Sequence, residues 1–125
     1  MAFAYPILVV EDEPDGRELV SRILKVAAVQ VELAEDGEQA WDMLQTAMYS
    51  AAVIDLALPG MDGMQLLGYI RDDPRLAHLP CVAITAYHTP ELKQRALQQG
   101  FDGYFPKPLD RTIFLNALNS IVEPD

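Results

Sequence analysis

Several features that mark particular classes of protein are scarce or missing in this chain of 125 residues. It contains one cysteine, Cys81, so no disulfide can form within the chain, which fits a reducing compartment. No apolar run approaches the ~18 residues that span a bilayer. The first six residues lack the positive charge that begins a secretion signal. These absences predict a cytoplasmic protein without a membrane partner.

Basic residues are also few. Nine Lys and Arg stand against nineteen Asp and Glu, which gives a formal net charge of -10 and a pI of about 4.4. Nucleic acids and anionic membranes both favour a basic face, so neither is an expected partner. The chain has no G-x-x-x-x-G-K-[ST] loop, which excludes a P-loop NTPase. His78 and His88 lack the spacing of metal ligands and are interpreted as surface residues.

Strand-like and helix-like segments alternate five times, a rhythm typical of a parallel α/β sheet. Continuous apolar runs at 7–10, 51–54 and 81–85 predict strands that are buried on both faces. The segment 29–33 alternates with period two, and the segment 102–105 is short and leads into proline. Both are therefore predicted at sheet edges. The result is a doubly wound, five-stranded parallel sheet of flavodoxin-like order 2-1-3-4-5, with five helices on both faces.

The length and the apolar half of the composition predict a single domain over residues 1–125, with no output domain. Helical spacing in the first helix predicts a core stripe of Leu19, Ile23 and Val26. The helix expected between Thr89 and Gly100 carries only three apolar residues. We expect it to dock lightly, which suits a moving part.

Polar residues follow the predicted strands at their carboxyl ends. They are Glu11, Asp12, Asp55, Thr85 and Lys107. Ligands of open parallel sheets bind beyond these ends, near the point where strand order reverses. Two like charges ~4 Å apart repel by ~4 kcal/mol at an effective dielectric of 20, so three converging carboxylates need a cation or raised pKa values.

Mg²⁺ is the expected cation because it prefers oxygen ligands. Asp12 and Asp55 are interpreted as direct ligands, with Glu11 acting through a bound water and the Ala57 carbonyl as a further ligand. The Lys107 ammonium can balance carboxylate charge and bind a phosphoryl oxygen. The Thr85 hydroxyl can donate to the same phosphoryl oxygens.

In these motifs the chain resembles the response-regulator receiver domain of two-component signalling, in its single-domain, CheY-like form. The resemblance rests on the acidic pair within 7–13, the segment 55–63, Thr85-Ala86 and the segment 104–108, and it covers almost the whole chain. It implies that Asp55 is the phosphoacceptor. It also implies that Asp12, Asp55 and the Ala57 carbonyl bind Mg²⁺ with support from Glu11, and that Thr85 and Lys107 bind the phosphoryl group. It makes Tyr104 an aromatic switch that swings inward as Thr85 moves.

The resemblance further implies a phosphohistidine donor on a sensor histidine kinase or a histidine phosphotransfer protein. The output surface would be the helix between Thr89 and Gly100, the strand at 102–105 and the helix that carries Phe114 and Ile121. The downstream effector stays open, and a homodimer through this surface is possible. In this family the first helix and the loop after the last strand usually set kinase choice. Candidates for that role here are Arg17, Val20, Leu24 and Leu109.

Two alternatives remain beside a signalling domain that catalyses only its own phosphorylation and dephosphorylation. One is a small flavodoxin-like phosphohydrolase, which usually places an acid two residues after the nucleophile. Ala57 occupies that position here and disfavours this hypothesis. The other is a phosphate-independent docking domain, which would not need the acidic pair, Asp55, Thr85 and Lys107 together.

Overall fold

The computed structural model describes residues 3–123, so residues 1, 2, 124 and 125 of the expected domain lie outside the described range. Five parallel strands form one sheet in the order β2-β1-β3-β4-β5, which confirms the predicted order. The strands are β1 (Ile7–Val10), β2 (Val31–Ala34), β3 (Ala51–Asp55), β4 (Cys81–Thr85) and β5 (Gly103–Pro106).

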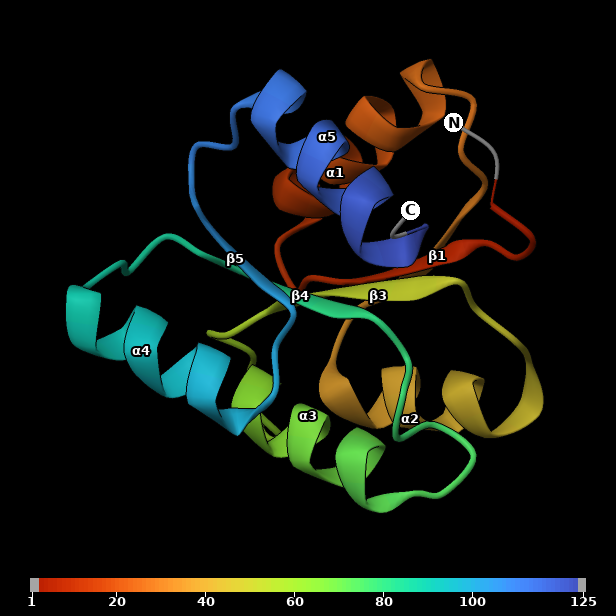
Figure 1. Ribbon diagram of the computed structural model, residues 1–125, viewed down its shortest axis with the longest axis vertical. Helices are drawn as coiled ribbons and strands as arrows, with labels where there is room; N and C mark the ends of the chain where they lie inside the picture. Colours follow the sequence, from red (N-terminus) through yellow and green to blue (C-terminus); the bar gives the residue numbers. More distant parts are fainter. Residues whose placement is uncertain (1–2, 124–125) are drawn as a thin grey trace.

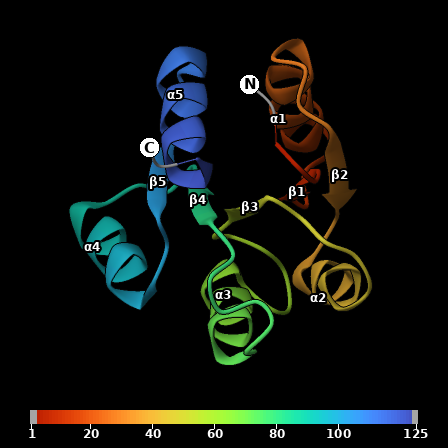
Figure 2. The same cartoon turned by 45° about the vertical axis from the view of Figure 1, so that its right-hand side comes forward.

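Five helices cover both faces of this sheet, as predicted. They are α1 (Pro14–Val26), α2 (Gly37–Thr46), α3 (Gly63–Asp72), α4 (Pro90–Gln99) and α5 (Arg111–Val122). Helices α1 and α5 lie on one face, and α2, α3 and α4 lie on the other (Figures 1 and 2). Within residues 3–123, none of the helices has the length and apolarity needed to cross a membrane.

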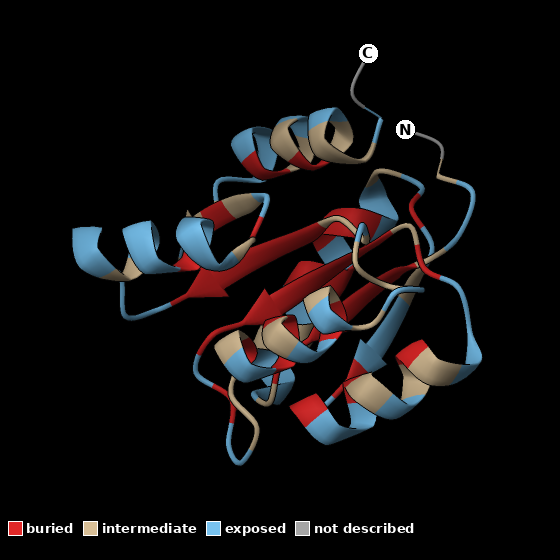
Figure 3. Cartoon of the chain, turned by 60° about the horizontal axis from the view of Figure 1, so that its bottom comes forward, coloured by how far each residue is buried: buried red, intermediate tan, exposed pale blue. Residues whose placement is uncertain are grey.

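Two hydrophobic cores sandwich the sheet because successive side chains of a strand point to opposite faces. In β1, Leu8 and Val10 belong to the core beneath α2, α3 and α4, whereas Ile7 and Val9 belong to the core beneath α1 and α5. The central strands are buried along their length, while β2 is largely exposed (Figure 3). The period-two pattern of β2 thus marked a sheet edge correctly.

The predicted core stripe of α1 is wrong at two of its three positions. Leu19 and Val26 are 48% and 69% exposed, and only Ile23 is buried. Val20 and Leu24 are buried beside Ile23 instead, which is the same helical spacing rotated by one residue. Their burial also removes Val20 and Leu24 from the residues that a partner could contact.

Side-chain caps set the helix starts near the site. Asp62 and Gln65 form the full reciprocal capping box at α3. Thr89 caps α4, and Gly100 ends it at a φ of 120°, a region that favours glycine. Only Ala96 of α4 is fully buried, so this helix docks as lightly as predicted. Its backbone is held at its C-terminal end, where Arg71 donates to the Gly100 carbonyl at 2.7 and 3.2 Å.

Candidate functional site

Three carboxylates meet at the carboxyl edge of the sheet, where strand order reverses between β1 and β3. Carboxylate oxygens of Glu11, Asp12 and Asp55 lie within 4.8 Å of one another. The pairing of Val10 with Ile54 sets the ends of the two strands side by side, so the residues that follow emerge together. Glu11 and Asp55 are buried, and Asp12 is half-buried toward solvent. The predicted convergence of the three acids is therefore present.

Lys107 joins this cluster from the end of β5. Its Nζ donates to Asp55 Oδ2 at 2.7 Å and to both Glu11 carboxylate oxygens at 3.0 and 3.1 Å. The Lys107 backbone N–H donates to the Thr85 carbonyl at 2.7 Å, which fixes the start of the side chain. The Lys107–Pro108 peptide bond is cis. One ammonium thus bridges two buried carboxylates.

Burial and crowding give the charged groups unequal pKa values. Burial, together with a hydrogen bond to Asp55, raises the pKa of Glu11 to about 8. Burial also acts to raise the pKa of Asp55, but hydrogen bonds with Glu11, Lys107 and the Ala57 N–H hold it below its ordinary value. The site therefore holds more carboxylates than one ammonium can neutralise, and a proton on Glu11 relieves the excess.

Thr85 ends β4 beside this cluster and is buried. Its Oγ1 accepts a hydrogen bond from the Tyr87 N–H at 3.0 Å. A hydroxyl that accepts such a bond can still donate its own proton. Ala57 lies on the other side, where its N–H donates to Asp55 Oδ1 at 2.8 Å. Both oxygens of the Asp55 carboxylate are therefore held, one by Ala57 and one by Lys107.

Arg17 supports the acidic loop, a role that sequence reasoning missed. One guanidinium nitrogen donates to the main-chain carbonyls of Glu11 and Asp12, at 3.0 Å each. Another lies 3.4 Å from a Glu35 carboxylate oxygen. Arg17 was a candidate for kinase choice, and that role stays a prediction. The same holds for Leu109, which is partly buried against the hydrophobic core beneath α1 and α5.

Two glycines pack directly against the site, and neither was predicted from the sequence. A Cβ at Gly16 would lie 2.5 Å from Glu11 Oε1, and a Cβ at Gly63 would lie 2.5 Å from the Asp55 carbonyl oxygen. A glycine in the first turns of a helix beside an acidic loop is the signal that could have indicated such close approach.

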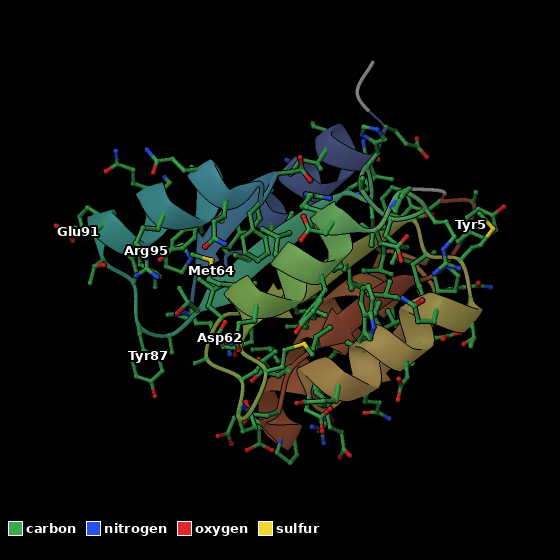
Figure 4. The ribbon with its side chains drawn as sticks, turned by 90° about the horizontal axis from the view of Figure 1, so that it is seen from below. Tyr5, Asp62, Met64, Tyr87, Glu91 and Arg95 are labelled. Carbon is green, nitrogen blue, oxygen red and sulfur yellow. The ribbon has the colours of Figure 1, made fainter. Side chains whose placement is uncertain are left out.

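Tyr104 and His88 lie on the side of the sheet that carries α4. Tyr104 is buried, and its hydroxyl is 3.0 Å from His88 Nδ1. His88 itself is exposed, as predicted. Tyr87 is also exposed and extends away from the ribbon (Figure 4).

A cavity lies away from these residues, at the amino ends of β3 and β4. It measures about 610 Å³ and extends from the end of α2 at Leu44 to Pro80 before β4. Its lining contains no carboxylate and no lysine. The acidic cluster is therefore the better candidate for charge chemistry, because reactive groups converge there.

The fold and the site define a doubly wound α/β domain with an acidic cluster bridged by one lysine. Residues 7–119 match the family model of the response regulator receiver domain, and the chain belongs to this family. It is similar to the chemotaxis protein CheY of Pseudomonas aeruginosa, with 32% identity over 94% of this chain and 95% of that protein.

A second relative is the response regulator Rre1 of Synechocystis sp., which is 35% identical over 88% of this chain. The chain spans about half of that protein, 48% of its length. Among solved structures, a receiver domain of a sensor histidine kinase from Pseudomonas aeruginosa PAO1 has a TM-score of 0.87 at 28% identity. The match covers 96% of this chain and 98% of that chain, whose active site cleft coordinates a magnesium ion.

Proposed function

We propose that this receiver domain accepts a phosphoryl group on Asp55 and thereby switches the surface formed by α4, β5 and α5. The supporting observation is the Asp55 carboxylate, which is buried yet stays ionised between Lys107 and the Ala57 N–H. An ionised oxygen of Asp55 attacks phosphorus, and the bond from phosphorus to the donor nitrogen breaks. With a phosphohistidine donor, the imidazole leaves with the electron pair and takes up a proton.

The residues of the acidic cluster fit a Mg²⁺ ion. Three carboxylates with one ammonium carry excess negative charge, and hard oxygen ligands suit this cation. Asp12, Asp55 and the Ala57 carbonyl would hold it directly, with Glu11 acting through a bound water. When bound, Mg²⁺ would neutralise charge on the transferring phosphoryl oxygens. The magnesium reported in the related sensor-kinase receiver domain supports the same assignment.

The other site residues would position and neutralise the phosphoryl group. Lys107 can turn from the carboxylates to a phosphoryl oxygen, because its ammonium is a point charge on a flexible stem. Thr85 can donate its hydroxyl proton to a second oxygen. Phosphoryl transfer needs mainly such positioning and charge neutralisation. This chemistry would allow the domain to catalyse its own phosphorylation without turnover of a metabolite.

The light docking of α4 supports a switch on that side of the molecule. The negative charge of a phosphoryl group on Asp55 would attract the Thr85 hydroxyl at the end of β4. The loop that follows Thr85 leads into α4. Tyr104 on β5 is the proposed aromatic element of the switch. The donor would be a sensor histidine kinase or a histidine phosphotransfer protein in the cytoplasm. The α4, β5 and α5 surface would contact an effector or a second copy of the domain.

Phosphorylation by a small acyl phosphate tests this function directly. Wild type, Asp55→Asn and the control Asp42→Asn are incubated with acetyl phosphate and Mg²⁺, and the intact masses are measured. We expect one phosphoryl group on wild type and on Asp42→Asn, and none on Asp55→Asn or after chelation of Mg²⁺. Labelling of Asp55→Asn at the wild-type level would refute the assignment. An unlabelled wild type without phosphate release would favour a docking domain, and phosphate release that persists in Asp55→Asn would favour a phosphohydrolase.

A further inference from the structure

One contact joins the loop after Thr85 to the last strand. His88 in this loop places its Nδ1 3.0 Å from the hydroxyl oxygen of Tyr104 on β5. The two ring centroids are 5.5 Å apart, with an angle of 56° between the planes. Tyr104 is only 7% exposed, so its hydroxyl needs a partner within the protein. The exposed His88 ring provides one such partner, and the Thr89 backbone provides another.

The other side-chain hydrogen bonds of this loop lie at its two ends. At the start, the Tyr87 N–H donates to Thr85 Oγ1 at 3.0 Å. At the other end, Thr89 Oγ1 accepts the Leu92 N–H at 3.0 Å and caps α4. All four residues from 86 to 89 are exposed. The hydrogen bond between His88 and Tyr104 therefore links a side chain of this loop to β5, beside the contact of the Thr89 backbone with the same hydroxyl.

We propose that His88 is a positioning residue that holds Tyr104 in its buried position and couples the loop after Thr85 to β5. Burial, partly offset by the Thr89 backbone, raises the pKa of Tyr104, so the phenol keeps its proton. The phenol can then donate to Nδ1 of a neutral imidazole that carries its hydrogen on Nε2. The link acts through hydrogen-bond geometry and ring contact, since the loop has little other packing.

The consequence for signalling rests on the proposed function. If the Thr85 hydroxyl moves toward a phosphoryl group on Asp55, the loop should move with it, because the Tyr87 N–H donates a hydrogen bond to that hydroxyl. His88 follows one residue later and displaces its hydrogen-bond partner on β5. His88 and β5 also border a groove of about 420 Å³, which includes Leu97 of α4 and Pro106 of β5. Movement of this link would therefore change the shape of the α4 and β5 surface.

A double-mutant cycle tests the link without phosphorylation. Amide hydrogen exchange is measured across α4 and β5 in His88→Leu, Tyr104→Phe and the double variant. A hydrogen bond contributes ~1 kcal/mol net, so each single change should raise exchange in the first turn of α4 about fivefold. The double variant should exchange no faster than Tyr104→Phe alone, because the loss of the phenol hydroxyl already removes the bond to His88. The proposal would be overturned if the increases in exchange rate of the two single variants multiplied in the double variant. Unchanged exchange in the single variants would also overturn it.

Two further variants separate positioning from general loosening. His88→Asn keeps a polar atom near the Nδ1 position and should restore most of the wild-type exchange. His78→Leu, an equivalent change at another exposed histidine, should leave α4 exchange unchanged. Equal effects of His88→Leu and His78→Leu would refute a specific link.

The last measurement adds acetyl phosphate and Mg²⁺. We expect phosphorylated wild type to change exchange in α4 and β5, and His88→Leu to be labelled equally on Asp55 but to lose most of that change. An equal change in both proteins would overturn the coupling role. Failure of wild type to be labelled would count against the proposed function, while the cycle in unphosphorylated protein would still decide whether His88 positions Tyr104.

Discussion

The buried carboxylate of Glu11 makes a quantitative prediction for stability against pH. Its pKa is about 8 in the folded protein without metal and 4.5 ordinarily. The folded state therefore binds a proton that the unfolded chain has released over this interval. The resulting stabilisation is complete below 4.5 and is lost as the pH rises through about 8. The free energy of unfolding should fall by ~1.4 kcal/mol per pH unit within the interval, or ~2 kcal/mol from about pH 6 to about pH 8.

The other two groups of the cluster with shifted pKa values, Asp55 and Lys107, titrate outside this pH interval. The pKa of Asp55 is lowered from 3.8, so its contribution is present above that value and is lost only as the pH falls below it. Although burial acts to lower it, hydrogen bonds to Asp55 and Glu11 raise the pKa of Lys107 above 10.5. The Lys107 contribution is present below 10.5 and is lost as the pH rises above it. Between pH 6 and 8, Glu11 should thus dominate the response of these three groups.

Urea unfolding in the presence of a chelator measures this slope. Glu11→Gln should unfold with nearly the same free energy at both pH values, because the amide has no proton to lose. The exposed Glu91→Gln should keep the wild-type loss of ~2 kcal/mol. Addition of Mg²⁺ should stabilise wild type more at pH 8 than at pH 6, since the metal competes with the Glu11 proton. A flat wild-type profile, or an equal slope in Glu11→Gln, would refute the reasoning.

Three further predictions concern packing and support of the site. Gly63→Ala should lower the free energy of unfolding by ~2 kcal/mol or more, since its Cβ would lie 2.5 Å from a β3 carbonyl oxygen. Gly68→Ala, with open space around its Cβ, should be neutral or stabilise α3 by up to ~1 kcal/mol. Phe114→Ala should cost ~4 kcal/mol because the ring is fully buried, whereas the exposed Ile113→Ala should cost under ~1 kcal/mol. Arg17→Ala should weaken Mg²⁺ binding several-fold in calorimetry, and wild-type affinity in this variant would show that the loop holds its shape unaided.

The architecture was predictable because its signals are local. A strand buried on both faces must be apolar at every position, so β1, β3 and β4 could be located from unbroken apolar runs. The alternation in β2 and the proline after a short run placed the two edges, and the edges fixed the strand order. The acidic residues and Lys107 follow strand ends, so parallel pairing alone brings them to one edge of the sheet.

Other features depended on contacts between distant segments. The sequence could not decide which of two faces of α1 is buried, because Leu19 and Val20 are both apolar. Only the packing of the helix in the core that it shares with β1 and α5 selects Val20. Arg17 looks like an ordinary surface residue of a helix until its guanidinium is seen against the carbonyls of the acidic loop.

The sequence by itself determined which charged residues could form a reactive site and at which edge of the sheet they gather. Strand periodicity and residue type are local properties that short segments of sequence show. Only the tertiary structure decided how unequally the acids are buried, that one lysine bridges Glu11 and Asp55, and that His88 meets Tyr104. Burial, distance and hydrogen-bond direction arise from the packing of segments up to 96 residues apart, and no local pattern encodes them.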